Sequence, residues 1–216
     1  MSNDIWVYVD HFKGDAMPAS WEVLGAARTL SVDLDTGVAA LVFGHQVSGL
    51  SQDALSFGAA EVLLCDDPTM ADFRVEACAA VLSKLAADNS PAVILAPATT
   101  RGRDVIAATS VDLESSAVSD GIALAVDDGI VQVTRPVYAG KLHSTVAARN
   151  VRPQLISLRP RAFPKPEPGS YRIGKVTNVA AVLAEDEIMV KVTDYETADG
   201  QVSLTDASII VSGGRG

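Results

Sequence analysis

The stretch AVILAPATTRGRD, residues 92–104, joins an apolar run to a polar segment that suits the start of a helix. Ala92–Pro97 predicts a strand, because short apolar runs bounded by turn residues are typical of buried strands. Thr99 or Thr100 can cap a helix that runs to about Leu113, since a hydroxyl there accepts a hydrogen bond from a free backbone N–H. Strand, loop and helix in this order are the repeating unit of a parallel α/β fold.

The same alternation extends toward the N-terminus. Three further apolar runs predict strands at Ile5–Asp10, Val38–Gly44 and Glu61–Cys65. Helical patterns lie between them; the first takes Ser20 as its N-cap, and the strongest covers Ala71–Ala87 with one apolar face. Strands that are apolar throughout are buried on both faces, and helical connections make them parallel. The first half of the chain therefore predicts a doubly wound α/β unit.

The second half of the chain has a different pattern. Asp127, Asp128 and Gly129 separate two apolar runs, which predicts a β-hairpin. Leu142–Ala148 and Pro153–Pro160 predict further strands. The expected fold class is α/β, with a doubly wound, mostly parallel sheet and added antiparallel strands in the second half.

A proline-rich segment divides the chain further. Four prolines between residues 160 and 168 predict a stiff, extended stretch and a boundary near residue 165. Lys175–Ala198, with a polar break at residues 185–187, predicts two strands that reach out from the main body, and these strands could act as a dimerisation arm. We expect an N-terminal α/β scaffold domain at 1–165, projecting strands that complete or extend it at 166–207, and a separate unit at 208–216.

Composition excludes several classes of protein. The net charge of −10 argues against a nucleic-acid partner, which requires clustered Lys and Arg. The two cysteines form no CxxC pair and the three histidines are scattered, so no metal site is expected. No stretch approaches the ~20 apolar residues of a transmembrane helix, and the first ten residues lack the pattern of a signal peptide. A cytoplasmic location is therefore expected.

Several stretches, in order along the chain, resemble the α subunit of electron-transfer flavoproteins. They are IWVYVDHFKGDAMPASWEVLGAAR, VILAPATTRGRDVIAATSVDLESSAVSD, TRPVYAGKLHSTV, QLISLRPRAFP and ASIIVSGGRG, and they span essentially all 216 residues. The resemblance implies an α/β scaffold of the three-layer sandwich type related to adenine-nucleotide hydrolases. It also implies a heterodimer with a β subunit, which carries electrons between flavin-dependent dehydrogenases and a downstream acceptor and is not an enzyme.

The resemblance places the flavin largely outside this sequence. In the family, FAD sits mainly in a C-terminal α domain that opens with the SGGRG loop, here Ser212–Gly216. We therefore expect residues 208–216 to be the first strand and Gly-rich loop of an FAD-binding domain, and no cofactor on these 216 residues alone. The role expected of this chain is that of a scaffold and β-subunit interface. A stand-alone nucleotide-binding module of the universal-stress type is the alternative.

Two groups of residues are the candidate flavin contacts. Ser212, Gly213, Gly214 and Arg215 can approach a phosphate, because glycine lets the backbone come close and arginine adds charge; the alternative is a flexible terminus. Arg135 lies in TRPVYAGK, and the resemblance implies that in some members an arginine of this motif approaches a flavin bound in the β subunit. A cation there would stabilise a reduced, anionic flavin. The alternative for Arg135 is a structural role on a strand edge.

Two other basic stretches remain open in function. The loop APATTRGRD follows a presumed central strand, where ligands bind in doubly wound sheets, so it is either an anion or nucleotide pocket or a helix cap that contacts a neighbouring subunit. The resemblance implies that the β subunit, not the α subunit, uses its counterpart loop for AMP. Arg159, Arg161 and Lys165 form a basic strip that either steers an acidic partner or belongs to a solvated linker.

Overall fold

The main sheet has seven parallel strands. They are β1 (Ile5–Tyr8), β4 (Val38–Gly44), β5 (Glu61–Asp66), β6 (Val93–Pro97), β7 (Ala117–Gly121), β11 (Gln154–Leu158) and β12 (Lys175–Asn178). Their order across the sheet is β12-β5-β4-β1-β6-β11-β7, and every neighbouring pair is parallel. The structure is a computed structural model, and it describes residues 4–169, 174–196, 207 and 209–216.

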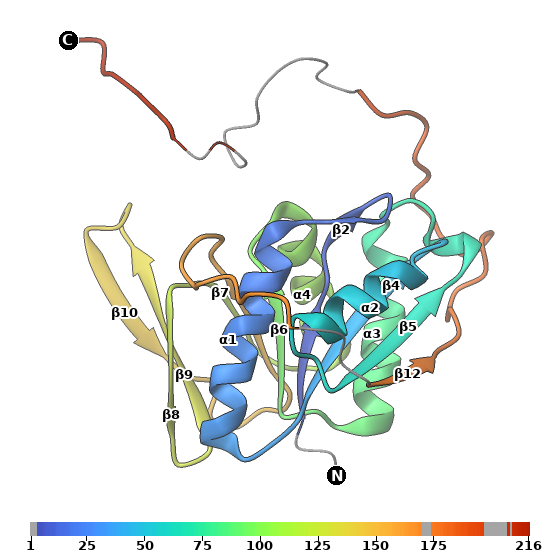
Figure 1. Cartoon of the computed structure of the whole chain (residues 1–216), viewed down its shortest axis with the longest axis horizontal. Coiled ribbons are helices and arrows are strands. Elements are labelled where there is room, and N and C mark those ends of the chain that lie inside the picture. The colour runs from blue at the N-terminus through green and yellow to red at the C-terminus, as the bar shows by residue number, and fades with distance from the viewer. Residues whose placement is uncertain (1–3, 170–173, 197–206, 208) are drawn as a thin grey trace.

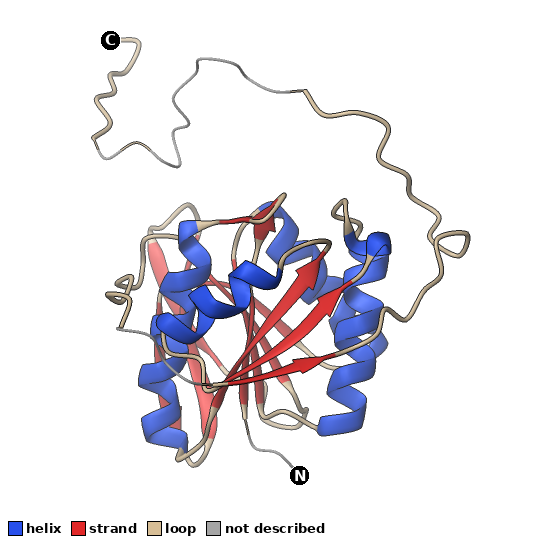
Figure 2. Cartoon of the chain, turned by 45° about the vertical axis from the view of Figure 1, so that its right-hand side comes forward, coloured by secondary structure: helices blue, strands red, loops and turns tan. Residues whose placement is uncertain are grey.

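Two layers of helix cover the sheet, one on each face (Figure 2). The helices are α1 (Pro18–Leu34), α2 (Ser48–Ser56), α3 (Val75–Asn89) and α4 (Thr100–Asp112), with a short 3₁₀ helix, η1 (Pro68–Met70). Side chains of α1 and α2 share one buried cluster with the sheet, and those of α3 and α4 share the other. The predicted fold class, a doubly wound three-layer α/β sandwich, is therefore confirmed.

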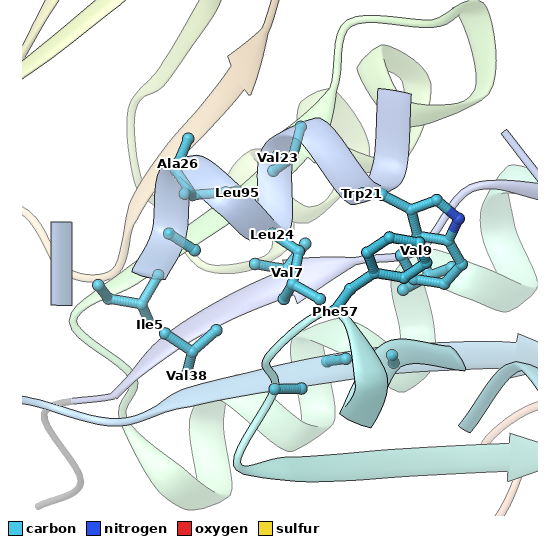
Figure 3. Close-up of a cluster of buried hydrophobic side chains, with 14 of the residues drawn as sticks. Ile5, Val7, Val9, Trp21, Val23, Leu24, Ala26, Val38, Phe57 and Leu95 are labelled. Atoms are coloured by element: carbon cyan, nitrogen blue, oxygen red, sulfur yellow. The ribbon is translucent and has the colours of Figure 1, made fainter. Parts of the chain in front are cut away.

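The central strands form because their residues are apolar on both sides. Every residue of β1, β4 and β6 is buried, and Ile5 pairs with Val38 on one side and Val93 on the other. On the α1 face, Trp21 stacks on Phe57 with ring centroids 4.7 Å apart (Figure 3). Burial of such aromatic side chains supplies much of the stabilisation of a core of this kind.

The start of α1 differs from the prediction. Ser20 was expected to cap this helix, but the N-cap residue is Met17 and Pro18 occupies the first turn. Proline suits that position because its fixed φ is helical and it has no N–H to leave unpaired. The Ser20 hydroxyl is instead buried against Asp10: it accepts from the Asp10 amide and donates to the Asp10 carbonyl, both at 2.9 Å.

A small antiparallel sheet lies beside α1 (Figure 1). Its strands are β8 (Ala123–Asp127), β9 (Ile130–Val137) and β10 (Leu142–Val146), with β9 in the centre. The predicted hairpin is confirmed: Asp128 and Gly129 both have positive φ, at 51° and 71°, as tight hairpin turns require. Val131 and Val133 of β9 join the α1-side core. A second short ribbon, β2 (His11–Phe12) and β3 (Asp15–Ala16), precedes α1.

The proline-rich segment is mostly exposed but contacts α1. A side chain at Gly25 would lie 2.9 Å from the Pro166 ring and 3.0 Å from the Pro164 carbonyl, so helix and segment touch. Phe163 packs against the α1-side core. The chain then returns to the opposite edge of the sheet, where β12 pairs with β5.

Only one of the two strands expected within 175–198 is found in the described residues. β12 does not project, because it extends the main sheet. Residues 179–196 contain no strand; they lie against the α3 side of the body, where Ile188 is buried with 1% exposure in the core shared with α3 and α4. Burial of Ile188, with Val179, Ala181 and Leu183 packed beside it, holds the segment where the sequence pattern suggested a projecting strand.

Candidate functional site

The crevice at the carboxyl ends of β1 and β6 holds a pocket of about 690 Å³. These two strands are neighbours in the middle of the sheet; β1 continues through α1 to β4 on one side, whereas β6 continues through α4 toward β7 on the other. The strand order therefore reverses at this point, which is the usual ligand position of a doubly wound sheet. Three segments form most of the pocket wall: Met17–Ala19, Ala98–Arg101 and Pro160–Arg161.

The APATTRGRD loop closes one side of this pocket. Thr99 is the N-cap of α4, as predicted, and its side-chain oxygen accepts from the Gly102 amide at 3.0 Å. A side chain at Gly102 would come within 2.1 Å of the Pro97 carbonyl oxygen, so only glycine lets the helix begin this close to the strand. The helix cap is thus confirmed and a pocket lies beside it, while contact of this loop with a neighbouring subunit stays a prediction.

Asp10 forms the floor of the pocket and is a residue that sequence reasoning missed. Its side chain is 1% exposed, and Arg101 donates from Nε to its Oδ1 at 2.6 Å. Its Oδ2 is buried with no hydrogen-bond partner among the described residues. The available signal was an acidic residue directly after a buried strand; its partner, 91 positions away, was not visible in the sequence.

Arg135 lies on β9, next to a second group of charges. Asp120 accepts from Nε of Arg159 at 3.0 Å and from its Nη2 at 2.5 Å. The Arg159 hydrogen bonds, followed by the charges of Arg103 and Arg135, lower the pKa of Asp120, although partial burial opposes them. Three cations thus surround one carboxylate, and the group carries a net positive charge.

Arg135 lies on the central strand of the small sheet, where it pairs with Ser144 of β10, and the register of β9 with β8 ends one residue earlier, at Thr134. The flavin contact and the structural role of Arg135 both remain predictions. Its Nε is buried, and within the described residues the structure records no hydrogen bond to its guanidinium group. The turn that follows contains three residues with positive φ, Tyr138, Ala139 and Gly140, and exposes 76% of Tyr138.

The SGGRG residues lie apart from both groups. Ser212, Gly213, Gly214 and Arg215 are exposed, and the described residues show no hydrogen bond or ion pair to any of them. The strand expected at 208–211 is absent over residues 209–211, and Ser208 lies outside the described residues. A lone strand has no neighbour to satisfy its backbone groups, so it does not form by itself.

The basic strip is tied to the chain's own residues. Arg159 binds Asp120, the Arg161 amide donates to Glu22 Oε2 at 2.5 Å, and the Arg161 guanidinium donates to the Ala207 carbonyl at 3.1 Å. Lys165 Nζ lies 5.2 Å from the centre of the Phe57 ring. All three basic residues are nevertheless solvent-exposed, so steering of a partner and the solvated linker both remain predictions.

The two thiols and the histidines offer little chemistry. Burial raises the pKa of Cys65 to about 12 and that of Cys78 to about 11, so both stay protonated in the core. His11 contacts the Phe43 carbonyl at 2.7 Å, at the end of β4. Within the described ranges, no three metal-binding side chains gather, and no helix has the length and hydropathy to cross a membrane.

Comparison with known proteins gives one family. The family model described as electron transfer flavoprotein domain matches residues 5–184. The chain is 35% identical over 99% of its length to an electron transfer flavoprotein subunit alpha of Thermoanaerobacterium thermosaccharolyticum, and covers 65% of that protein. It is 32% identical over 98% of its length to Protein FixB of Azorhizobium caulinodans, covering 59% of it. The chain thus spans roughly three fifths of the length of these relatives.

Proposed function

The chain belongs to the electron transfer flavoprotein family, and we propose that it is the N-terminal part of an α subunit that carries electrons between flavin-dependent dehydrogenases and a downstream acceptor. The observation that carries this proposal is the match of nearly the whole chain to α subunits. Several of the relatives are named electron transfer flavoprotein subunit alpha, and we propose no catalytic activity for this chain. The stand-alone nucleotide-binding module is not favoured by the family match.

We propose that this part of the α subunit is a scaffold for a β subunit and for a flavin domain. The proposed division places the scaffold at 1–165, its extension at 166–207 and the start of an FAD-binding domain at 208–216. The greater length of the relatives leaves room for such a domain. A cytoplasmic location belongs to the same proposal and agrees with two cysteines that remain free thiols.

Two groups of residues would contact FAD in the proposed heterodimer. FAD, when bound, supplies the redox chemistry by accepting electrons and passing them on. Gly213 and Gly214 have open space around them, so their amides can approach a phosphate, and Ser212 and Arg215 add a hydroxyl and a cation. These are the donor types that a flavin diphosphate requires.

Arg135 would supply a positive charge toward a flavin of the β subunit. Its lack of a recorded partner and the net positive charge around Asp120 support this role, because the charge is not cancelled within the described residues. Tyr138 and Leu142, 76% and 57% exposed, follow Arg135 on the same hairpin. We propose that this hairpin lies in the β-subunit interface, since exposed tyrosines are common anchors of interfaces.

Co-expression with the β subunit from the same genome tests the proposal. We expect a 1:1 complex by size-exclusion chromatography with light scattering, whereas the 216-residue chain alone is expected to be colourless. Tyr138→Ala should weaken the complex about tenfold or more, the range of an interface hot spot. Val111→Ala, which truncates an equally exposed apolar residue on α4, is the matched control and should have no effect. Failure to form a complex would contradict the proposed function.

A further inference from the structure

Two helix N-termini meet at the pocket between β1 and β6. Met17, Pro18 and Ala19 from the start of α1 line it, as do Thr99 and Thr100 from the start of α4. The two helices lie on opposite faces of the sheet, and both begin at its upper edge in Figure 1. Each N-terminus contributes a partial positive charge, so the crevice between them is suited to an anion.

Free donors remain at the start of α4. The Gly102 amide is used by the Thr99 cap, and the Arg103 amide donates to the Thr99 carbonyl at 3.0 Å. The structure records no acceptor for the amides of Thr100 and Arg101 within the described residues. Thr100 is exposed and Arg101 half-buried, and the N–H groups of a helix's first turn have no intrahelical acceptor, so these two amides are available to a ligand.

The side chains around the pocket have mixed charge. Arg101, Arg103 and Arg161 line it together with Asp10 and Glu22, which leaves one positive charge in excess. Arg101 donates a hydrogen bond to Oδ1 of Asp10. The other carboxylate oxygen, Oδ2, is buried without a partner in the described part of the chain. An unpaired carboxylate oxygen is unfavourable in a protein interior, and a hydrogen-bond donor at the pocket would relieve it.

We propose that this pocket binds a sugar phosphate, either free or as part of a nucleoside monophosphate. The phosphate lies at the start of α4, against the free amides of Thr100 and Arg101 and the Arg103 side chain. A sugar hydroxyl donates to Asp10, which completes the carboxylate. The volume of about 690 Å³ lies within the range of small-molecule sites. The site lies in a different part of the chain from the SGGRG residues, and it shares Arg103 with the charges around Asp120 and Arg135.

A proline substitution at Thr100 tests the site without disturbing the helix. Thr100 is the first residue of α4, where proline is favoured, and Thr99 has φ −69° and ψ 170°, as a residue before proline requires. Thr100→Pro removes one amide donor, whereas Thr100→Ala keeps it. By isothermal titration calorimetry with AMP and with ribose 5-phosphate, we expect Thr100→Pro to weaken binding roughly tenfold and Thr100→Ala to leave it nearly unchanged.

A second pair of matched variants tests how much the positive charge of the pocket contributes to ligand binding. Arg103→Ala and Arg149→Ala each remove one cation, but only Arg103 lines the pocket. Arg103→Ala should weaken binding several-fold, and Arg149→Ala should not. Unchanged thermal unfolding of each variant shows that the fold is intact.

Titrations with different ligands test which chemical groups the pocket recognises. Adenosine and inorganic phosphate are each expected to bind more weakly than AMP, because each lacks one of the two contacts. Backbone amide NMR shifts of Ala19, Thr100 and Arg101 on adding AMP would locate the ligand. The proposal is overturned if neither AMP nor ribose 5-phosphate binds at millimolar concentration, if Thr100→Pro and Arg103→Ala have no effect, or if the shifts lie elsewhere.

Discussion

The central strands β1, β4 and β6 and the C-terminal segment 174–196 belong to the same body but are held in different ways. The strands are buried along their whole length and receive side chains from helices on both faces. The segment lies at the edge of the sheet and along the α3 side, mostly exposed, with Ile188 as its fully buried residue. Apolar burial is therefore complete along the strands, whereas in the segment one residue is fully buried and Val179, Ala181 and Leu183 pack against the core while partly buried.

Polar contacts supply the rest of the attachment of this segment. Arg74 donates two hydrogen bonds of 2.8 Å to the Glu185 carboxylate, the Tyr195 hydroxyl donates to Asp72 at 2.8 Å, and the Val190 amide donates to Glu76 at 2.6 Å. Glu185 is exposed but the Arg74 side chain is buried, so this pair is only partly screened by water, whereas exposed polar contacts contribute little to stability. We expect the segment to open locally while the rest of the sheet stays folded.

The largest effect is expected in the central sheet. Ile94 on β6 is fully buried, and Ile94→Ala should lower the free energy of unfolding by about 4 kcal/mol, since it removes buried methyl groups and leaves a cavity. Urea unfolding followed by circular dichroism measures it. Ile94→Val, with a smaller cavity, should cost only about 1 kcal/mol. An Ile94→Ala effect below 1 kcal/mol would show that this strand is not part of the stabilising core.

Ile188→Ala tests the segment by the same chemical change. The side chain is 1% exposed, so its truncation should lower the free energy of local opening of 174–196 by about 2 to 3 kcal/mol. The global unfolding free energy should fall by less, because the segment can release before the sheet unfolds. Hydrogen exchange of the segment, compared with urea unfolding of the whole chain, separates the two. Equal losses in both measurements would mean that segment and sheet unfold as one unit.

The same contrast explains what the sequence could predict. β4 coincides with the predicted strand Val38–Gly44, because a strand buried on both faces is apolar at every position. The Asp127–Gly129 hairpin and the Thr99 cap were also predicted, since each depends on a local preference of the backbone. Features with a local cause are those that a single sequence reveals.

Features with a distant cause were not predicted. β11 inserts between β6 and β7, a pairing across dozens of residues that no local pattern specifies. Asp10 and Arg101 are brought together because β1 and β6 end side by side in the sheet, which the sequence does not reveal. Asp10 was therefore missed, although the APATTRGRD loop that lines the same pocket was predicted as a candidate site. The second strand expected within 175–198 is absent from the described residues for the same reason. Ile188 packs in the core shared with α3 and α4, a distant contact that no local pattern specifies.

A polar contact in the central body should affect global stability. Thr99→Ala removes the cap of α4 and leaves the Gly102 amide without its side-chain acceptor. We expect a loss of about 1 kcal/mol in the free energy of unfolding, measured with urea, since this is the usual effect of an N-cap replacement. Thr99→Ser retains the oxygen and should recover most of the loss. A larger loss in Thr99→Ser than in Thr99→Ala would contradict the assigned role of the hydroxyl.

The smallest effect is expected from a polar contact in the segment, and it depends on pH. Hydrogen bonds from Arg74 and then from Lys191 lower the pKa of Glu185 from 4.5 to about 2. A lowered pKa means that the folded chain favours the carboxylate, so the contribution is complete above about pH 4.5 and is lost as the pH falls toward 2. Hydrogen-exchange protection of residues 179–196, corrected for intrinsic rates, should therefore decrease across this window.

Glu185→Gln separates this titration from that of other acids. The variant cannot form the ion pair with Arg74 at any pH, so its segment should be less protected at neutral pH and should lose the pH response between 4.5 and 2. Urea unfolding of the same variant should change less than the protection of the segment, because the pair lies outside the central sheet, although the buried Arg74 loses its counter-ion. If the unfolding of the whole chain followed the Glu185 titration instead, the segment and the sheet would be one cooperative unit, and the contrast between them would concern burial alone.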